Sequence, residues 1–199
     1  HGDAVGGTHP RNLLHGRLGE AESLPAEYYQ IMLSPAITRE ELAALLYVRS
    51  FGLRTVTSKP EVKIMTDISD RWARAYVIEV TKHDIMSIFP NHTFQPNAAV
   101  TRGELAQALF NLVQRVGLKE AYLAAARGEM GLTDVDPSNR YYKAIQAMCA
   151  LGIISPFEGG VFRPSDLVAG TEAVEAFNKL EMVANLTLPS EHPTPGTSN

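Results

Sequence analysis

The sequence predicts an all-α protein built from three related helix-loop-helix repeats. Three observations predict this fold class: apolar residues recur at helical spacing in several segments, no alternating strand of useful length is present, and the helical segments repeat along the chain. Because a unit of two helices cannot bury its apolar faces alone, we expect the repeats to stack on a common axis and share one core.

The predicted helices are segments in which apolar residues lie three and four positions apart. In chain order they span 37–50, 72–83, 101–116, 119–127, 140–151 and 171–184. The first carries Leu42, Leu45 and Leu46 on one face, and the fourth is an Ala-rich connector. The segments between them are short loops.

An internal repeat organises the chain. Residues 72–114 align with 140–182, and 35–43 match the stretch at 99–106, whereas the half that should precede residue 35 is shortened. The matched residues of the two longer copies include the pairs Phe89/Phe157, Phe94/Phe162, Pro96/Pro164 and Glu104/Glu172. The predicted organisation is a flexible segment 1–22, a partial first repeat 23–58, a second repeat 59–117, a connector helix 118–130, a degenerate third repeat 131–186 and a Pro/Ser/Thr-rich tail 187–199.

Composition excludes several classes of protein. Of the 199 residues, 45% are hydrophobic and 20% charged, with a net charge of -4, which argues against wholesale disorder and against a broad nucleic-acid surface. The single cysteine, Cys149, excludes an internal disulfide framework. No apolar stretch is long enough for a membrane span.

Since the chain opens at His1 without an apolar leader, we expect a processed product or a piece of a longer chain.

The recurrent motif T-R-x-E is typical of a capping box. Thr38 and Thr101 are the predicted N-caps, and Glu41 and Glu104 follow three residues later, where a carboxylate can reach back to the amide of the cap. The motif therefore predicts where two helices begin.

Each motif also places an arginine at the first residue of its helix. Arg39 and Arg102 would lie beside unpaired backbone N–H groups, which together with a guanidinium favour a carboxylate or phosphate. The third repeat has Ala169 and Gly170 at the cap and arginine positions. We therefore expect two anion sites rather than three.

Three segments resemble S-layer homology domains. They are TDISDRWARAYVIEVTKHDIMSIFPNHTFQPNAAVTRGELAQAL at 66–109, LTDVDPSNRYYKAIQAMCALGIISPFEGGVFRPSDLVAGTEAVEAF at 132–177 and SPAITREELAAL at 34–45. The resemblance implies a pseudo-threefold helical module that anchors a bacterial envelope protein by binding a cell-wall glycan, often a pyruvylated polysaccharide, in grooves between repeats. It also implies that Arg39, Arg102, Asp67 and Trp72 contact the ligand.

The chain departs from the family pattern at several positions. Arg140 stands where the third repeat should carry tryptophan, Asp84 replaces the usual glycine of the second repeat, and the first repeat has no aspartate or tryptophan of its own. A different wall glycan, plain peptidoglycan or a protein partner therefore stays open. The alternative function is a structural or protein-interaction module of an envelope assembly or filament that has lost glycan binding.

Structural roles compete with ligand binding for most of these residues. The arginines could brace a loop, Trp72 could fill the core, and Asp67 and Asp134 could cap the following helices. The paired phenylalanines are expected in the core between repeats, and Cys149 is expected to be an unreactive small hydrophobe.

Enzymatic and metal-binding functions have no support in the sequence. No HExxH, GxSxG or phosphate-loop motif is present, so we expect no catalytic residue and no cofactor. The residues His1, Asp3, His9 and His15 have irregular spacing, and we expect no metal site there. A non-catalytic appendage of an envelope enzyme is the third, more distant hypothesis.

Overall fold

The computed structural model describes residues 24–50, 60–116, 118 and 130–187. Within these ranges the regular structure is helical, with only isolated β-bridges, so the predicted all-α class is confirmed. The expectations for segment 1–22, for the connector helix at 119–129 and for the tail beyond 187 concern residues outside the described ranges.

The helices follow the predicted order. They are α2 (Ala26–Gln30), the 3-10 helix η1 (Ile31–Leu33), α3 (Arg39–Ser50), α4 (Arg74–Lys82), α5 (Arg102–Arg115), α7 (Tyr142–Ala150), the 3-10 helix η3 (Glu158–Gly160) and α8 (Gly170–Thr187). The short α2 and η1, which form the shortened first half of the first repeat, were not predicted as helices.

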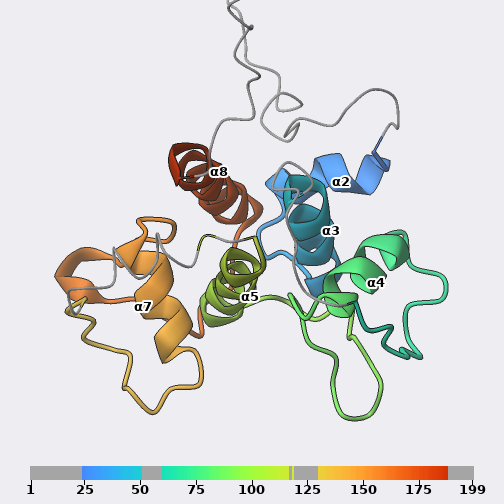
Figure 1. Ribbon diagram of the computed structural model, residues 1–199, viewed down its shortest axis with the longest axis horizontal. Coiled ribbons are helices and arrows are strands. Elements are labelled where there is room, and N and C mark those ends of the chain that lie inside the picture. The colour runs from blue at the N-terminus through green and yellow to red at the C-terminus, as the bar shows by residue number, and fades with distance from the viewer. Residues whose placement is uncertain (1–23, 51–59, 117, 119–129, 188–199) are drawn as a thin grey trace, which may run out of the picture.

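The helices form a closed arrangement of repeats. Figure 1 shows α3, α5 and α8 around the middle of the molecule, with α4 and α7 on opposite sides. The helix α4 packs on α3, α7 packs on α5, and η1 packs on α8. Each pair joins the second helix of one repeat to the first half of the next, and the last pair joins the third repeat back to the first.

Three backbone hydrogen bonds mark the centre of this ring. The amide of Val100 donates to Ile37 O at 2.8 Å, that of Val168 donates to Val100 O at 3.0 Å, and that of Ile37 donates to Val168 O at 2.8 Å. The three residues hold equivalent positions just before α3, α5 and α8, and all three are buried. This cyclic exchange gives the fold its pseudo-threefold symmetry.

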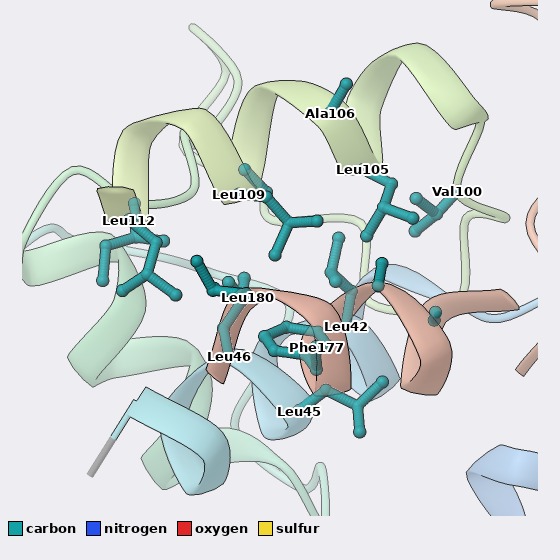
Figure 2. Packing of buried hydrophobic residues seen from close by; sticks show 14 of the residues in the cluster. Leu42, Leu45, Leu46, Val100, Leu105, Ala106, Leu109, Leu112, Phe177 and Leu180 are labelled. Atoms are coloured by element: carbon teal, nitrogen blue, oxygen red, sulfur yellow. The ribbon is translucent and has the colours of Figure 1, made fainter. Parts of the chain in front are cut away.

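The three central helices share one apolar core. Figure 2 shows side chains from all three converging, among them Leu42, Leu46, Leu109, Phe177 and Leu180. Burying one such side chain contributes about 1.5–3 kcal/mol relative to leaving it exposed. The core therefore fixes the helix N-termini, and the loops that meet them, at defined positions around the ring.

The N-terminus of α8, in the third repeat, has no room for a side chain. Gly170 stands where the other repeats carry arginine, and a Cβ atom there would overlap the carbonyl oxygen of Ile31. The amide of Gly170 instead donates to Ser34 O at 2.8 Å. Close backbone packing between the first and third repeats thus explains the missing third arginine.

Candidate functional site

Capping boxes begin α3 and α5. The amide of Glu104 donates to Thr101 Oγ1, while Glu104 Oε2 accepts from the amide of Thr101 at 2.9 Å and from its hydroxyl. Glu41 Oε2 likewise accepts from the amide of Thr38 at 2.7 Å, and the amide of Glu41 faces Thr38 Oγ1 at 3.4 Å. Both glutamates are therefore committed to the backbone of their own helix.

The other N–H groups at these helix starts are paired as well. The amides of Arg39 and Glu40 donate to the loop oxygens Ala98 O and Pro96 O, at 2.9 and 3.1 Å. The start of α5 is closed by the equivalent loop of the third repeat in the same way. The expectation that unpaired backbone N–H groups would help to hold an anion is wrong, so any attraction for anions must come from the side chains.

Arg39 is clamped by the loop of the second repeat. Its guanidinium carbon lies 5.1 Å from the ring centre of Phe89 and 4.6 Å from that of Phe94, which is cation–π geometry. Nε donates to Phe94 O and Nη2 donates to Ser87 O, both at 2.8 Å. Within the described ranges Nη1 of Arg39 has no hydrogen-bond partner and the side chain forms no ion pair.

Arg39 keeps its charge in this setting. Burial lowers the pKa of its guanidinium, while Glu104, Tyr141 and Asp67 act in the opposite direction. Arginine is not deprotonated in proteins at ordinary pH. Arg39 therefore presents a positive charge.

Arg102 lies in an equivalent clamp that is closed. Its guanidinium carbon is 4.6 Å from the ring centre of Phe157 and 4.7 Å from that of Phe162, and Nη2 donates to Ser155 O at 3.0 Å. Nη1 forms an ion pair with Glu172, the first-turn glutamate of α8. The residue is 4% exposed, and its Nε is buried without a partner in the described part of the chain.

Glu172 is available for this ion pair because its helix has no capping box. The residue three positions earlier is Ala169, which has no side-chain oxygen for a cap and leaves Glu172 unengaged. Burial raises the pKa of the Glu172 carboxyl, and Arg102 opposes that rise. No such carboxylate pairs with Arg39 in the described ranges.

Two cavities with shared lining residues lie where the second repeat meets the third, and Arg39 lines the first of them. The first, of about 340 Å³, is bounded by Arg39 and Phe89 and by the outer face of α5. The second, of about 330 Å³, lies against Pro164. Glu104, Arg140 and Tyr141 line both. We call the two together the Arg39 groove; Arg102 lines neither cavity.

Asp67 and Asp134 fix the loops rather than the helices that follow them. The amides of Phe94 and Gln95 donate to the two oxygens of Asp67 at 2.8 and 2.7 Å. Asp134 receives the equivalent pair of amides in the third repeat, both at 2.6 Å. The expected capping of α4 and α7 is wrong, since neither helix has a side-chain cap. Direct ligand contact by Asp67 stays a prediction.

Trp72 belongs to an aromatic cluster. It is half-buried, meets Tyr76 edge to face at 6.1 Å, and Tyr76 in turn lies 5.3 Å from Tyr47. Trp72 packs against the core and lines neither cavity of the Arg39 groove. Its sugar-stacking role stays a prediction.

The paired phenylalanines differ from expectation. Phe94 and Phe162 are buried as predicted, whereas Phe89 is only partly buried and Phe157 is 44% exposed. The rings of Phe89 and Phe157 cover guanidinium groups instead of filling the core. The two phenylalanines have the same spacing in both repeats, which indicates a shared role. This spacing does not reveal which arginine they contact.

The remaining expectations concern reactivity. Cys149 is buried, and burial raises the pKa of its thiol to about 11, with a smaller opposing effect from Arg102. The described residues contain no cluster of side chains able to hold a metal ion. Among the helices within those ranges, none combines the length and hydropathy that a membrane crossing needs.

Comparison with known proteins gives a consistent result. The profile of the S-layer homology domain matches residues 65–106 and 131–173. Cell surface glycoprotein 1 of Acetivibrio thermocellus is 24% identical over 146 residues, which are 72% of this chain and 6% of that protein. The cellulosome-anchoring protein of the same organism is 26% identical over 145 residues, which are 72% of this chain and 31% of that protein. An amylopullulanase of Thermoanaerobacterium thermosulfurigenes is 30% identical over 86 residues, or 41% of this chain and 5% of the enzyme. The chain thus spans only a minor part of each of these relatives.

Proposed function

Because the chain belongs to the S-layer homology domain family, we propose that it is a non-catalytic anchoring module of a bacterial cell envelope that binds an acidic cell-wall glycan in the Arg39 groove. The names of two relatives, a cell surface glycoprotein and a cellulosome-anchoring protein, agree with that location and role. The ligand would be a pyruvylated polymer or peptidoglycan, both of which carry carboxylates.

One observation carries the proposal: equivalent arginines have different partners at Nη1. In the closed clamp, Nη1 of Arg102 holds the carboxylate of Glu172. In the open clamp, Nη1 of Arg39 has no partner within the described residues, and Arg39 lines a cavity of about 340 Å³. The chain thus holds its own example of the complex that a carboxylate from outside would form with Arg39.

The surrounding residues prepare Arg39 for this role. Phe89 and Phe94 both contact the guanidinium with their rings, and two carbonyl oxygens fix its orientation before a ligand arrives. Asp67 acts on Arg39 indirectly. It accepts a hydrogen bond from the amide of Phe94, and the carbonyl of Phe94 accepts one from Nε of Arg39. We therefore assign ligand contact to Arg39, positioning to Asp67 and a structural role to Arg102.

We expect a single groove of this size to bind a glycan with modest affinity. Anchoring becomes stronger when many copies of the module bind one polymer.

The test of the proposal is co-sedimentation with purified cell-wall sacculi. Arg39→Gln removes the charge at the groove, and Arg74→Gln removes one from an exposed position on α4 outside both cavities. We expect Arg39→Gln to lose most of the bound fraction and Arg74→Gln to keep it.

Two outcomes would contradict the proposal. Equal sedimentation of both variants and the wild type would remove Arg39 from the site. A wild-type protein that stays in the supernatant but forms a defined oligomer by light scattering would favour the structural, self-assembling module instead.

A further inference from the structure

We propose that Arg140 is a second cationic contact in the Arg39 groove, so that the site takes a glycan segment with more than one acidic group rather than a single acidic sugar. This inference rests on the proposed function and adds the charge requirement of the ligand.

Arg140 is placed by the start of α7. It comes one residue before the N-cap Tyr141, just as Trp72 comes one residue before the N-cap Ala73 of α4. Its guanidinium carbon lies 4.6 Å from the ring centre of Tyr141, and the residue is exposed. Within the described ranges it forms no hydrogen bond or ion pair. A cation thus replaces the aromatic residue of the preceding repeat and stays available.

Arg140 and Arg39 line a shared space whose acidic residue belongs to a capping box. Both line the first cavity, and the acidic residue on that lining, Glu104, is held in the capping box with Thr101. Tyr141 lies close enough to both arginines and to Glu104 to feel their charges. Burial and Glu104 raise the pKa of its phenol, while Arg140 and Arg39 lower it. Two guanidinium groups with no ion-pair partner in the described residues are suited to a ligand with separated negative charges.

The shape of the groove agrees with an extended ligand. Arg140 lines both cavities, so it lies where the first adjoins the second. Polar side chains for sugar hydroxyls are present on each side, with Gln107 and Asn111 in the first cavity and Asn139 and Ser165 in the second. Each cavity lies at the lower end of the usual size of small-molecule sites. A glycan that crosses from one to the other passes Arg140.

The experiment uses glycan fragments released from sacculi and separated by anion exchange into fragments with one acidic group and fragments with several. Dissociation constants are measured by calorimetry for the wild type, Arg39→Gln, Arg140→Gln, Arg140→Lys and Arg163→Gln. We expect Arg140→Gln to bind the multiply acidic fragments about three- to tenfold more weakly, with a shallower dependence on salt, and to bind singly acidic fragments as the wild type does. Arg140→Lys, which keeps the charge, recovers part of the loss.

Arg163→Gln is the matched control. Arg163 is also exposed, stacks on an aromatic ring at 4.7 Å, and lines neither cavity. Its backbone φ of 58° equals that of Gln95 at the same position of the second repeat, so glutamine suits the site. If Arg140→Gln binds multiply acidic fragments as tightly as Arg163→Gln does, while Arg39→Gln does not bind them, the inference is overturned and the proposed function stands. If the wild type binds no fragment, both are overturned.

Discussion

The clamps around Arg39 and Arg102 are built from the same parts, yet only one of them is open. Each arginine makes cation–π contacts with two phenylalanines and donates Nη2 to a serine carbonyl of the next repeat. The difference lies in the following helix. Glu104 is held by Thr101 and leaves Arg39 open, whereas Glu172 has no cap to bind and pairs with Arg102.

This contrast gives the capping box a second consequence. Its usual effect is to stabilise a helix start by about 1 kcal/mol. Here the box on α5 also keeps a carboxylate away from the arginine of the neighbouring repeat. We therefore expect that loss of one hydroxyl, as at Ala169, releases a glutamate that can pair with the arginine of the neighbouring repeat.

The sharpest test substitutes each arginine in turn. Arg102→Gln leaves the half-buried Glu172 without its partner, and we expect the free energy of unfolding to fall by about 2–4 kcal/mol. Arg39→Gln breaks no ion pair and should cost about 1–2 kcal/mol while removing glycan binding. Chemical denaturation and sacculus sedimentation below the unfolding transition measure the two effects. If both variants lost stability and glycan binding to the same extent, the proposal that Arg39 binds the ligand while Arg102 is structural would be wrong.

Opening the closed clamp is the second test. Glu172→Gln frees Nη1 of Arg102 from its carboxylate, so we expect a second site for acidic fragments at a cost of about 1–2 kcal/mol in stability. Calorimetry with short fragments should show the stoichiometry rise from one toward two. Glu175→Gln, an exposed change on the same helix, serves as the control. An unchanged stoichiometry would mean that the clamp lacks the space a ligand needs.

Closing the open clamp is the converse test. Thr101→Ala copies the situation of Ala169, so Glu104 can leave the helix start and pair with Arg39. We expect a loss of about 1 kcal/mol in stability and weaker sedimentation with sacculi. Thr38→Ala removes the cap of α3 at a similar cost in stability without releasing Glu104. If both variants bind sacculi alike, the capping box does not control the groove.

The smallest expected effect on stability concerns Asp134, which holds the loop that contacts Arg102 through Phe162. Although desolvation raises the pKa of the Asp134 carboxyl, the amides of Phe162 and Arg163 lower it more, and the net pKa lies below its usual value. The ionised carboxylate therefore stabilises the fold at neutral pH, and this contribution disappears as the pH falls below about 4. Asp134→Asn should lower the unfolding free energy by at most about 1 kcal/mol at pH 7, and this difference should shrink as the pH falls through the lowered pKa of Asp134. A difference that stays the same at every pH would show that the effect is not ionic.

The parts that the sequence predicts well are those set by neighbouring residues. The helices α3, α5 and α8 follow from apolar periodicity, and the placement of Thr101 and Glu104 in a capping box follows from their spacing. The helix α2 has only five residues, too few for a periodic pattern, and so it was missed.

The parts that the sequence does not predict depend on partners from other repeats. Glu172 reaches Arg102 from the next repeat, and the loop carbonyls that accept from the helix N-termini are also far away along the chain. Arg140 stood out in the sequence only as a departure from a pattern. Its position between two cavities depends on how the second and third repeats meet.

The cyclic exchange between Ile37, Val100 and Val168 has a consequence for how the molecule comes apart. A linear array of repeats can fray from either end, because a terminal unit contacts one neighbour. In a closed ring every unit contacts two, and the shortened first repeat covers the start of α8. Removing any unit exposes the other two at once, so we expect cooperative, all-or-none unfolding. Under pulling force, such a module holds its whole structure until it yields in a single step.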